Sequence, residues 1–160
     1  MAKAEVRDTT EGAVELRKVA ALLGGTRVLK HEVSGQLDAH EMIVRGLPAR
    51  ALSHLIGELI VMEPTTSLEN AIGISLRTFQ RRRAMPSKPL STEQSSRSWK
   101  FAEILSKATT IFGSQEEAEQ WLERPAIGLN QRRPIDLLAS SAGLELVEDH
   151  LGRLEYGVYS

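Results

Sequence analysis

Three arginines and two hydroxyl-bearing side chains lie between positions 75 and 82, where their spacing suits contact with a polyanion. On a helix each residue is rotated by about 100° from the one before, so four of them share the arc opposite Leu76 and Phe79. An arginine can donate two parallel hydrogen bonds to guanine, and it also attracts phosphate groups. The candidate DNA-binding residues are therefore Ser75, Arg77, Thr78, Arg81 and Arg82.

Residues 66–84 have the layout of a helix-turn-helix motif, which would place these side chains in a major groove. A capping-box pattern from Thr66 to Glu69 predicts the start of a short helix, and Gly73 is suited to end it. Ser75 can then cap a second helix that begins at Leu76. An arginine cluster without such a frame is more often solvated surface or a site for an acidic partner, but the frame favours DNA.

A single helix-turn-helix module makes few basic contacts and binds weakly at physiological salt. Specific binding therefore requires two copies, which would contact half-sites about 34 Å apart. We accordingly expect a homodimer that binds operator DNA.

Residue types that perform catalysis or hold metals are not grouped along the chain. There is no cysteine, and the four histidines, His31, His40, His54 and His150, are scattered without an HExxH pattern. P-loop, GxGxxG and GxSxG patterns do not occur either. We expect a protein that is not an enzyme and that needs no cofactor and no metal.

The charge is unevenly distributed along the 160 residues, although the whole chain carries only −1. Residues 67–102 contain seven Lys/Arg against two Asp/Glu, whereas residues 103–160 contain five against ten. A basic middle and an acidic C-terminal region indicate two surfaces for two different partners. No run approaches the roughly 20 apolar residues of a membrane span, and no apolar signal core follows Met1, so we expect a cytoplasmic protein without membrane contact.

Apolar residues recur at helical spacing, which predicts an all-α fold. The clearest stripe lies in a helix expected over residues 48–62 and consists of Leu52, Leu55, Ile56, Leu59 and Ile60. Further helices are expected over residues 13–23 and 38–45, after residue 101 and after residue 141, while 26–37 could be a short strand or a packed loop. Prolines and serines over residues 85–96 indicate a connector. We expect an N-terminal helical region with the helix-turn-helix over residues 1–98 and a C-terminal domain over 99–160.

From Trp99 to Ser160, short motifs follow one another in a definite order. They include Ile111-Phe112-Gly113, Trp121-Leu122, Pro134-Ile135-Asp136-Leu137-Leu138 and Gly157-Val158. This order resembles the toxin-binding domain of the MbcA/ParS/Xre antitoxin family of bacterial toxin–antitoxin systems. Upstream, Gly46-Leu47-Pro48, Gly73-Ile74-Ser75, Arg77-Thr78 and Arg81-Arg82 are similar to the Xre-like helix-turn-helix that precedes that domain. Ser95 and Arg97 match a Ser-Asp-Arg element of the family, from which Ser96 departs.

The resemblance implies a type II antitoxin that binds a cognate RES-domain toxin, an enzyme that depletes NAD⁺, and that represses its own operon. The candidate toxin-binding residues are Arg153, Tyr156, Val158, Tyr159 and Ser160. Aromatic side chains and a terminal carboxylate could enter the pocket that holds an anionic substrate. The alternative is that this tail packs on its own helix or frays.

Two other functions remain open from the sequence. The chain could be a stand-alone helix-turn-helix transcriptional regulator whose C-terminal half only dimerises. It could also be a structural adaptor that uses the helix-turn-helix fold for protein contact without DNA.

Overall fold

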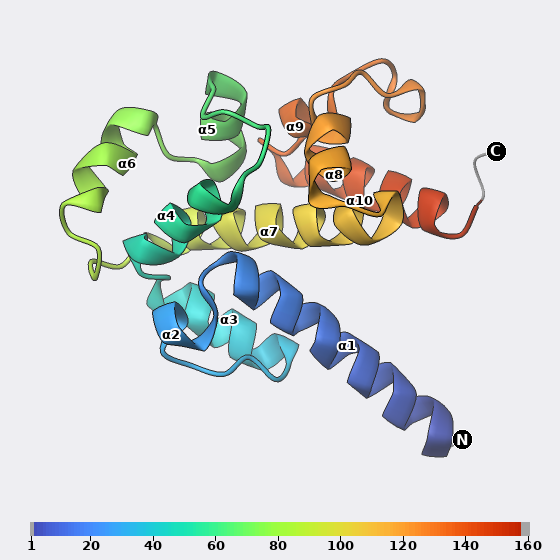
Figure 1. Ribbon diagram of the computed structural model, residues 1–160, viewed down its shortest axis with the longest axis horizontal. Coiled ribbons are helices and arrows are strands. Elements are labelled where there is room, and N and C mark those ends of the chain that lie inside the picture. The colour runs from blue at the N-terminus through green and yellow to red at the C-terminus, as the bar shows by residue number, and fades with distance from the viewer. Residues whose placement is uncertain (1, 158–160) are drawn as a thin grey trace. The chain divides into compact units, whose positions relative to one another are not determined.

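The computed structural model describes the backbone of residues 2–157 and the side chains of residues 11–157. Its elements are α1 (Ala2–Leu22), α2 (Gly25–Leu29), α3 (Gln36–Arg45), α4 (Ala49–Glu58), α5 (Thr66–Ile72), α6 (Leu76–Arg83), α7 (Thr92–Phe112), α8 (Gln115–Leu122), the 3₁₀ turn η1 (Ile127–Leu129), α9 (Pro134–Leu137) and α10 (Ser141–Glu155) (Figure 1). The prediction of an all-α fold is confirmed, since the described residues form no strand beyond two isolated bridges. No described helix is both long enough and apolar enough to cross a bilayer.

The helices group into two compact units that are each discontinuous in sequence. One unit comprises Met1–Glu58 and Arg82–Ala102, and the other comprises Leu59–Arg81 and Glu103–Ser160. Helices α6 and α7 each contribute residues to both units. The second unit therefore contains α5, most of α6 and every helix after α7.

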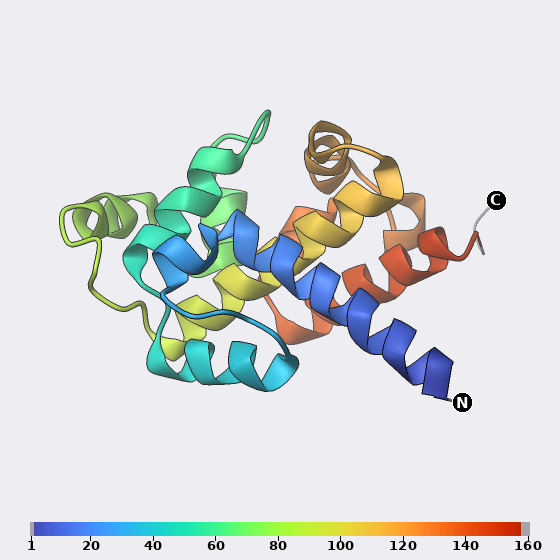
Figure 2. The ribbon, with the colours of Figure 1, turned by 60° about the horizontal axis from the view of Figure 1, so that its bottom comes forward.

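In the first unit, α1 packs against α2 and α4. Helix α1 begins at Ala2 rather than near residue 13, and its first turns extend beyond α2 and α3 of the same unit (Figure 2). Gly24 ends this helix region with φ +100°, a left-handed conformation that a side chain would strain. The segment left open at residues 26–37 contains the short helix α2 and a loop rather than a strand.

A second feature of the first unit is the pairing of residues 46–50 with the connector before α7. Leu90 donates its backbone N–H to the Leu47 carbonyl at 2.7 Å, and Pro48 and Pro89 form an antiparallel bridge. The Leu47 N–H donates in turn to the buried Ser95 hydroxyl at 2.8 Å. The connector is therefore held against the start of α4 by backbone hydrogen bonds.

The second unit is organised around one buried carboxylate, that of Glu119 on α8, whose exposed fraction is 0%. Its oxygens accept the backbone N–H groups of Ile60, Val61 and Met62 at 2.9–3.0 Å. Gln115 donates its side-chain amide to the same carboxylate at 2.9 Å. Three consecutive amides that point at one anion cannot continue a helical hydrogen-bond ladder.

The predicted helix over residues 48–62 is therefore wrong at its C-terminal end. Helix α4 stops at Glu58, and Ile60, which the apolar stripe predicted to be buried, is 59% exposed. Leu52 and Leu55, the first part of that stripe, are buried as expected.

Helix α5 packs against α9 within the second unit. Leu68, Ala71 and Ile72 of α5 are buried, and Ile135 of α9 is 1% exposed. Arg133, which precedes α9, donates to the Ser67 hydroxyl at 2.6 Å and forms a two-pronged pair with Asp136 at 2.9 and 3.0 Å. These hydrogen bonds lower the pKa of the Asp136 carboxyl and keep it ionised.

We expect Glu119→Ala to lower the free energy of unfolding by about 2–4 kcal/mol, because it leaves three amides, the Met62 N–H among them, without their acceptor. Urea unfolding followed by circular dichroism measures this loss. Glu116→Ala, an exposed glutamate on the same helix, is the control and should change stability by only a few tenths of a kcal/mol. Equal effects of the two substitutions would contradict the central role of Glu119.

Candidate functional site

Helices α5 and α6 form the helix-turn-helix frame that the spacing of caps and glycine predicts. Gly73 ends α5 in a left-handed conformation with φ +77°, and Ile74 in the turn is buried. Glu69 accepts the N–H of Leu76, the first residue of α6, at 2.7 Å, which fixes the angle between the helices. The predicted capping box at Thr66 is wrong by one residue, because Thr65 caps α5 through Leu68. Glu69 is consequently free to brace the turn.

The start of α6 is organised by two hydroxyl groups. Ser75 accepts the backbone N–H of Thr78 at 3.1 Å, as a helix N-cap does. It also donates its own hydroxyl proton to the Thr78 hydroxyl at 2.9 Å. Both side chains therefore support the local geometry of the helix that carries the arginines.

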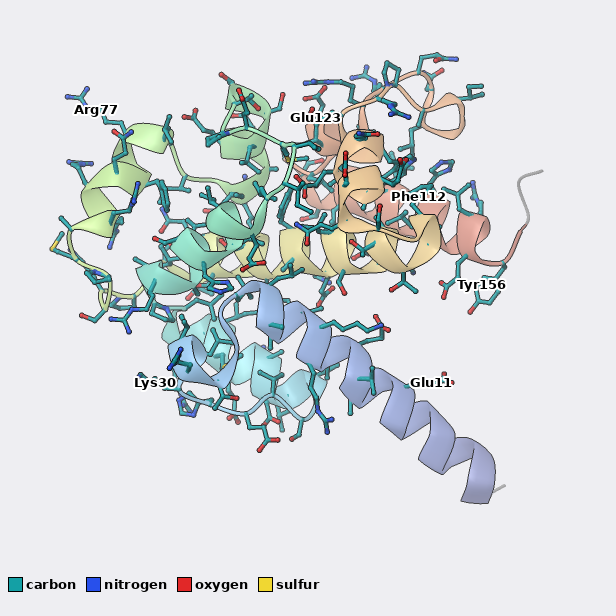
Figure 3. The ribbon with its side chains drawn as sticks, viewed as in Figure 1. Glu11, Lys30, Arg77, Phe112, Glu123 and Tyr156 are labelled. Atoms are coloured by element: carbon teal, nitrogen blue, oxygen red, sulfur yellow. The ribbon has the colours of Figure 1, made fainter. Side chains whose placement is uncertain are left out.

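The arginines of α6 differ in their surroundings. Phe79 is buried, while Arg77 and Arg81 are exposed, and Figure 3 shows Arg77 extending outward from the helix. Arg82 is half-buried and donates to the Pro89 carbonyl at 3.4 Å. Arg83, which the arc argument does not include, is exposed. Of the candidate DNA-binding residues, Arg77 and Arg81 are thus the cations that are exposed to solvent.

Two of the candidate toxin-binding residues, Arg153 and Tyr156, lie at the C-terminal end of α10. Arg153 is exposed, and Tyr156, labelled in Figure 3, is 81% exposed. Val158, Tyr159 and Ser160 lie outside the described residues. The helix itself is anchored by Val147 and Leu151, both 0% exposed.

A stack of rings joins α8 to α10 in the second unit. The rings of Trp121 and His150 are stacked nearly parallel, with their centroids 6.1 Å apart. The Phe112 ring also contacts Trp121, at a centroid distance of 5.3 Å. Gly128 of η1 leaves no room for a side chain, because a Cβ there would collide with the His150 ring. The neighbouring Ile127 is an apolar side chain that is 85% exposed. Helical periodicity could not identify it as an exposed surface residue, because it lies in the short turn η1.

Two domain families match the chain. Residues 38–103 match the antitoxin Xre-like helix-turn-helix domain. Residues 107–157 match the antitoxin Xre/MbcA/ParS C-terminal toxin-binding domain. A helix-turn-helix domain followed by a helical toxin-binding domain defines the class of protein.

Curated relatives agree with this class. The chain is 35% identical to an antitoxin Xre of Yersinia enterocolitica over 98 residues. This alignment covers 61% of the chain and 66% of the relative. It is 32% identical over 89 residues to an antitoxin Xre of Photorhabdus laumondii, covering 55% of the chain and 60% of the relative. An antitoxin Xre of Pseudomonas putida is 27% identical over 126 residues, and this alignment covers 79% of the chain and 76% of the relative. The matches span less than two thirds of the length of the first two relatives. The chain belongs to the Xre/MbcA/ParS antitoxin family.

Burial lowers the pKa of the His150 imidazole, and the Arg153 guanidinium lowers it further. The folded protein therefore binds this proton more weakly than the unfolded chain, whose histidine pKa is about 6.5. The stabilisation is complete above the unfolded pKa and is lost as the pH falls through the lower folded pKa. We expect the free energy of unfolding to fall between about pH 7.5 and about pH 5.

Urea unfolding followed by tryptophan fluorescence measures this pH dependence. The change should be smaller in His150→Gln than in the wild type, whereas His31→Gln, an exposed histidine, should leave it unaltered. The same pH dependence in His150→Gln and the wild type would contradict the assignment.

Proposed function

We propose that the protein is a type II antitoxin with two separate activities. It neutralises a cognate RES-domain toxin that depletes NAD⁺ by binding it directly, and it represses its own operon through the helix-turn-helix. The observation that carries this proposal is the succession of an exposed arginine helix and a C-terminal region that matches a toxin-binding domain over residues 107–157. The antitoxin itself needs no catalytic residue for either activity.

The DNA-binding activity is supported by the geometry of α6. Arg77 and Arg81 are four residues apart and exposed, so they lie on one face and can reach the same groove. Ser75 and Thr78 hold the start of the helix, from which recognition helices contact base edges. We propose a homodimer, because one such module has too few contacts for specific binding.

The toxin-binding activity is assigned to the C-terminal domain, for which we propose the boundaries 99–160. Residues 103–160 carry five Lys/Arg against ten Asp/Glu, and this acidic surface would attract a basic surface around a pocket for an anionic dinucleotide. Arg153 and Tyr156 are exposed at the end of α10 and can contact the toxin. The C-terminal helix and tail would then cover the toxin active site.

Co-purification from the native operon with only this protein tagged tests the proposal. We expect a second protein in stoichiometric amount, whose NAD⁺-consuming activity appears once the two are separated. A protein that elutes alone but shifts its own promoter DNA would instead be a stand-alone regulator.

We expect Arg77→Ala and Arg81→Ala together to abolish operator binding and to leave toxin neutralisation intact, because both cations lie on α6. Gel-shift titration and inhibition of NAD⁺ consumption measure the two activities. Arg27→Ala, an exposed arginine of α2, is the matched control and should bind operator DNA normally. Loss of both activities in folded protein would refute the separation of surfaces.

Deletion of residues 158–160 should weaken toxin inhibition, because it removes the aromatic ring of Tyr159, which we propose as an anchor in the toxin pocket. The readout is the concentration of antitoxin that halves NAD⁺ consumption by purified toxin. Leu37→Ala, which removes an apolar side chain that is 70% exposed on α3, is the control and should inhibit normally. Unchanged inhibition after the deletion would show that the tail does not cover the active site.

A further inference from the structure

A cluster of cations lies where the chain leaves α6, and three separate segments contribute to it. We call Arg50, Arg83 and Lys88 the basic cluster. Arg50 lies in the first turn of α4, Arg83 ends α6, and Lys88 belongs to the connector before α7. All three are exposed and belong to the first unit.

Backbone hydrogen bonds bring these segments together. Ala49 donates its N–H to the Lys88 carbonyl, and Arg50 donates to the Pro86 carbonyl, both at 3.0 Å. Successive turns join the end of α6 to the connector, since Met85 donates to Arg82 at 2.9 Å and Lys88 to Met85 at 3.1 Å. The Arg82 side chain adds its bond to the Pro89 carbonyl.

The pairing is rigid on its inner side. Leu47 and Leu90 are 1% and 3% exposed. Gly46 has φ +94°, and a Cβ there would collide with the Leu90 carbonyl oxygen, so only glycine allows the two segments to approach so closely. The backbone under the basic cluster is therefore ordered before any ligand arrives, and binding needs to order only the side chains.

The positive charge of the cluster is not neutralised within the described part of the chain. No salt bridge there involves Arg50, Arg83 or Lys88. By contrast Arg45, another exposed arginine of the first unit, has an acidic partner in Glu41 at 3.7 Å.

We propose that the basic cluster, which lies wholly within the first unit, binds the sugar–phosphate backbone of duplex DNA. The inference rests on the proposed DNA binding and adds a second, sequence-independent set of contacts to it. Lysine reaches a phosphate as a flexible point charge, and arginine pairs with phosphate oxygens through its planar guanidinium, so both can bind the DNA backbone without reading its sequence. The cluster thus fixes orientation and affinity, while Arg77 and Arg81 carry sequence discrimination.

The test is the salt dependence of DNA binding by the full-length protein, measured by fluorescence anisotropy with the promoter fragment and with a mixed-sequence duplex. Each of Arg50→Gln, Arg83→Gln and Lys88→Gln should reduce the log–log salt slope by about 0.9. Each should also weaken binding about fivefold at 0.15 M salt, and equally for both duplexes. Arg17→Gln, which removes an exposed charge from α1, is the control and should leave the slope unchanged.

The outcomes separate this inference from the proposed function. If the wild type binds the promoter but the three variants keep its slope, the basic cluster is not a phosphate site and the DNA-binding proposal survives. If a variant loses affinity only for the promoter fragment, its side chain reads bases and the inference is overturned. A wild type that binds neither duplex overturns both.

Discussion

The second unit depends on one charged side chain, the carboxylate of Glu119, that is buried in its interior, where charged groups are rare. The Glu119 carboxylate has no exposed surface, and its desolvation is offset because three backbone amides and one side-chain amide donate to it. Because Glu119 accepts the N–H groups of residues 60–62, α4 ends at Glu58. The same hydrogen bonds fix the segment that leads into α5. The buried pairing of α5 with α9 and the Arg133–Ser67 bond then complete the attachment of the helix-turn-helix to the C-terminal helices.

Charge and burial divide the chain between two proposed partners. The exposed cations of α6 and Lys88 of the basic cluster lie in a stretch with seven Lys/Arg against two Asp/Glu, and the residues after 102 carry the opposite balance. Opposite net charges keep each region from attracting the other's partner. Both helices are nevertheless held in the same way, by a hydroxyl cap and by buried apolar side chains: Ser75 and Phe79 for α6, and Ser140 and Leu151 for α10.

Local chemistry made much of this fold predictable from sequence. Gly73 and Ser75 stop or cap helices through contacts within four residues, and the structure has them in these roles. The predictions fail where a residue distant in sequence determines where a helix ends. Apolar spacing extended α4 through Ile60, and nothing near that segment signalled that Glu119 would take its amides. One signal was available: Glu119 lies three residues before Leu122, so both residues share the buried face of α8. A charged residue at such a position is nevertheless ordinarily assigned to the solvent-exposed surface. The basic cluster was equally hidden, because Arg50 and Lys88 are brought together only by backbone pairing.

The discontinuity of the second unit also bears on the order in which the chain is synthesised. Residues 59–81 emerge from the ribosome well before α8 and α9, yet Met62 and α5 contact those later elements. A nascent chain therefore holds α5 and α6 with their local hydrogen bonds but without the contacts to α8 and α9 until the last third has been made, and domains generally fold as units. Chains that end early would carry the arginine helix without these long-range contacts. The last third of the chain thus completes a structural unit whose first part is synthesised much earlier.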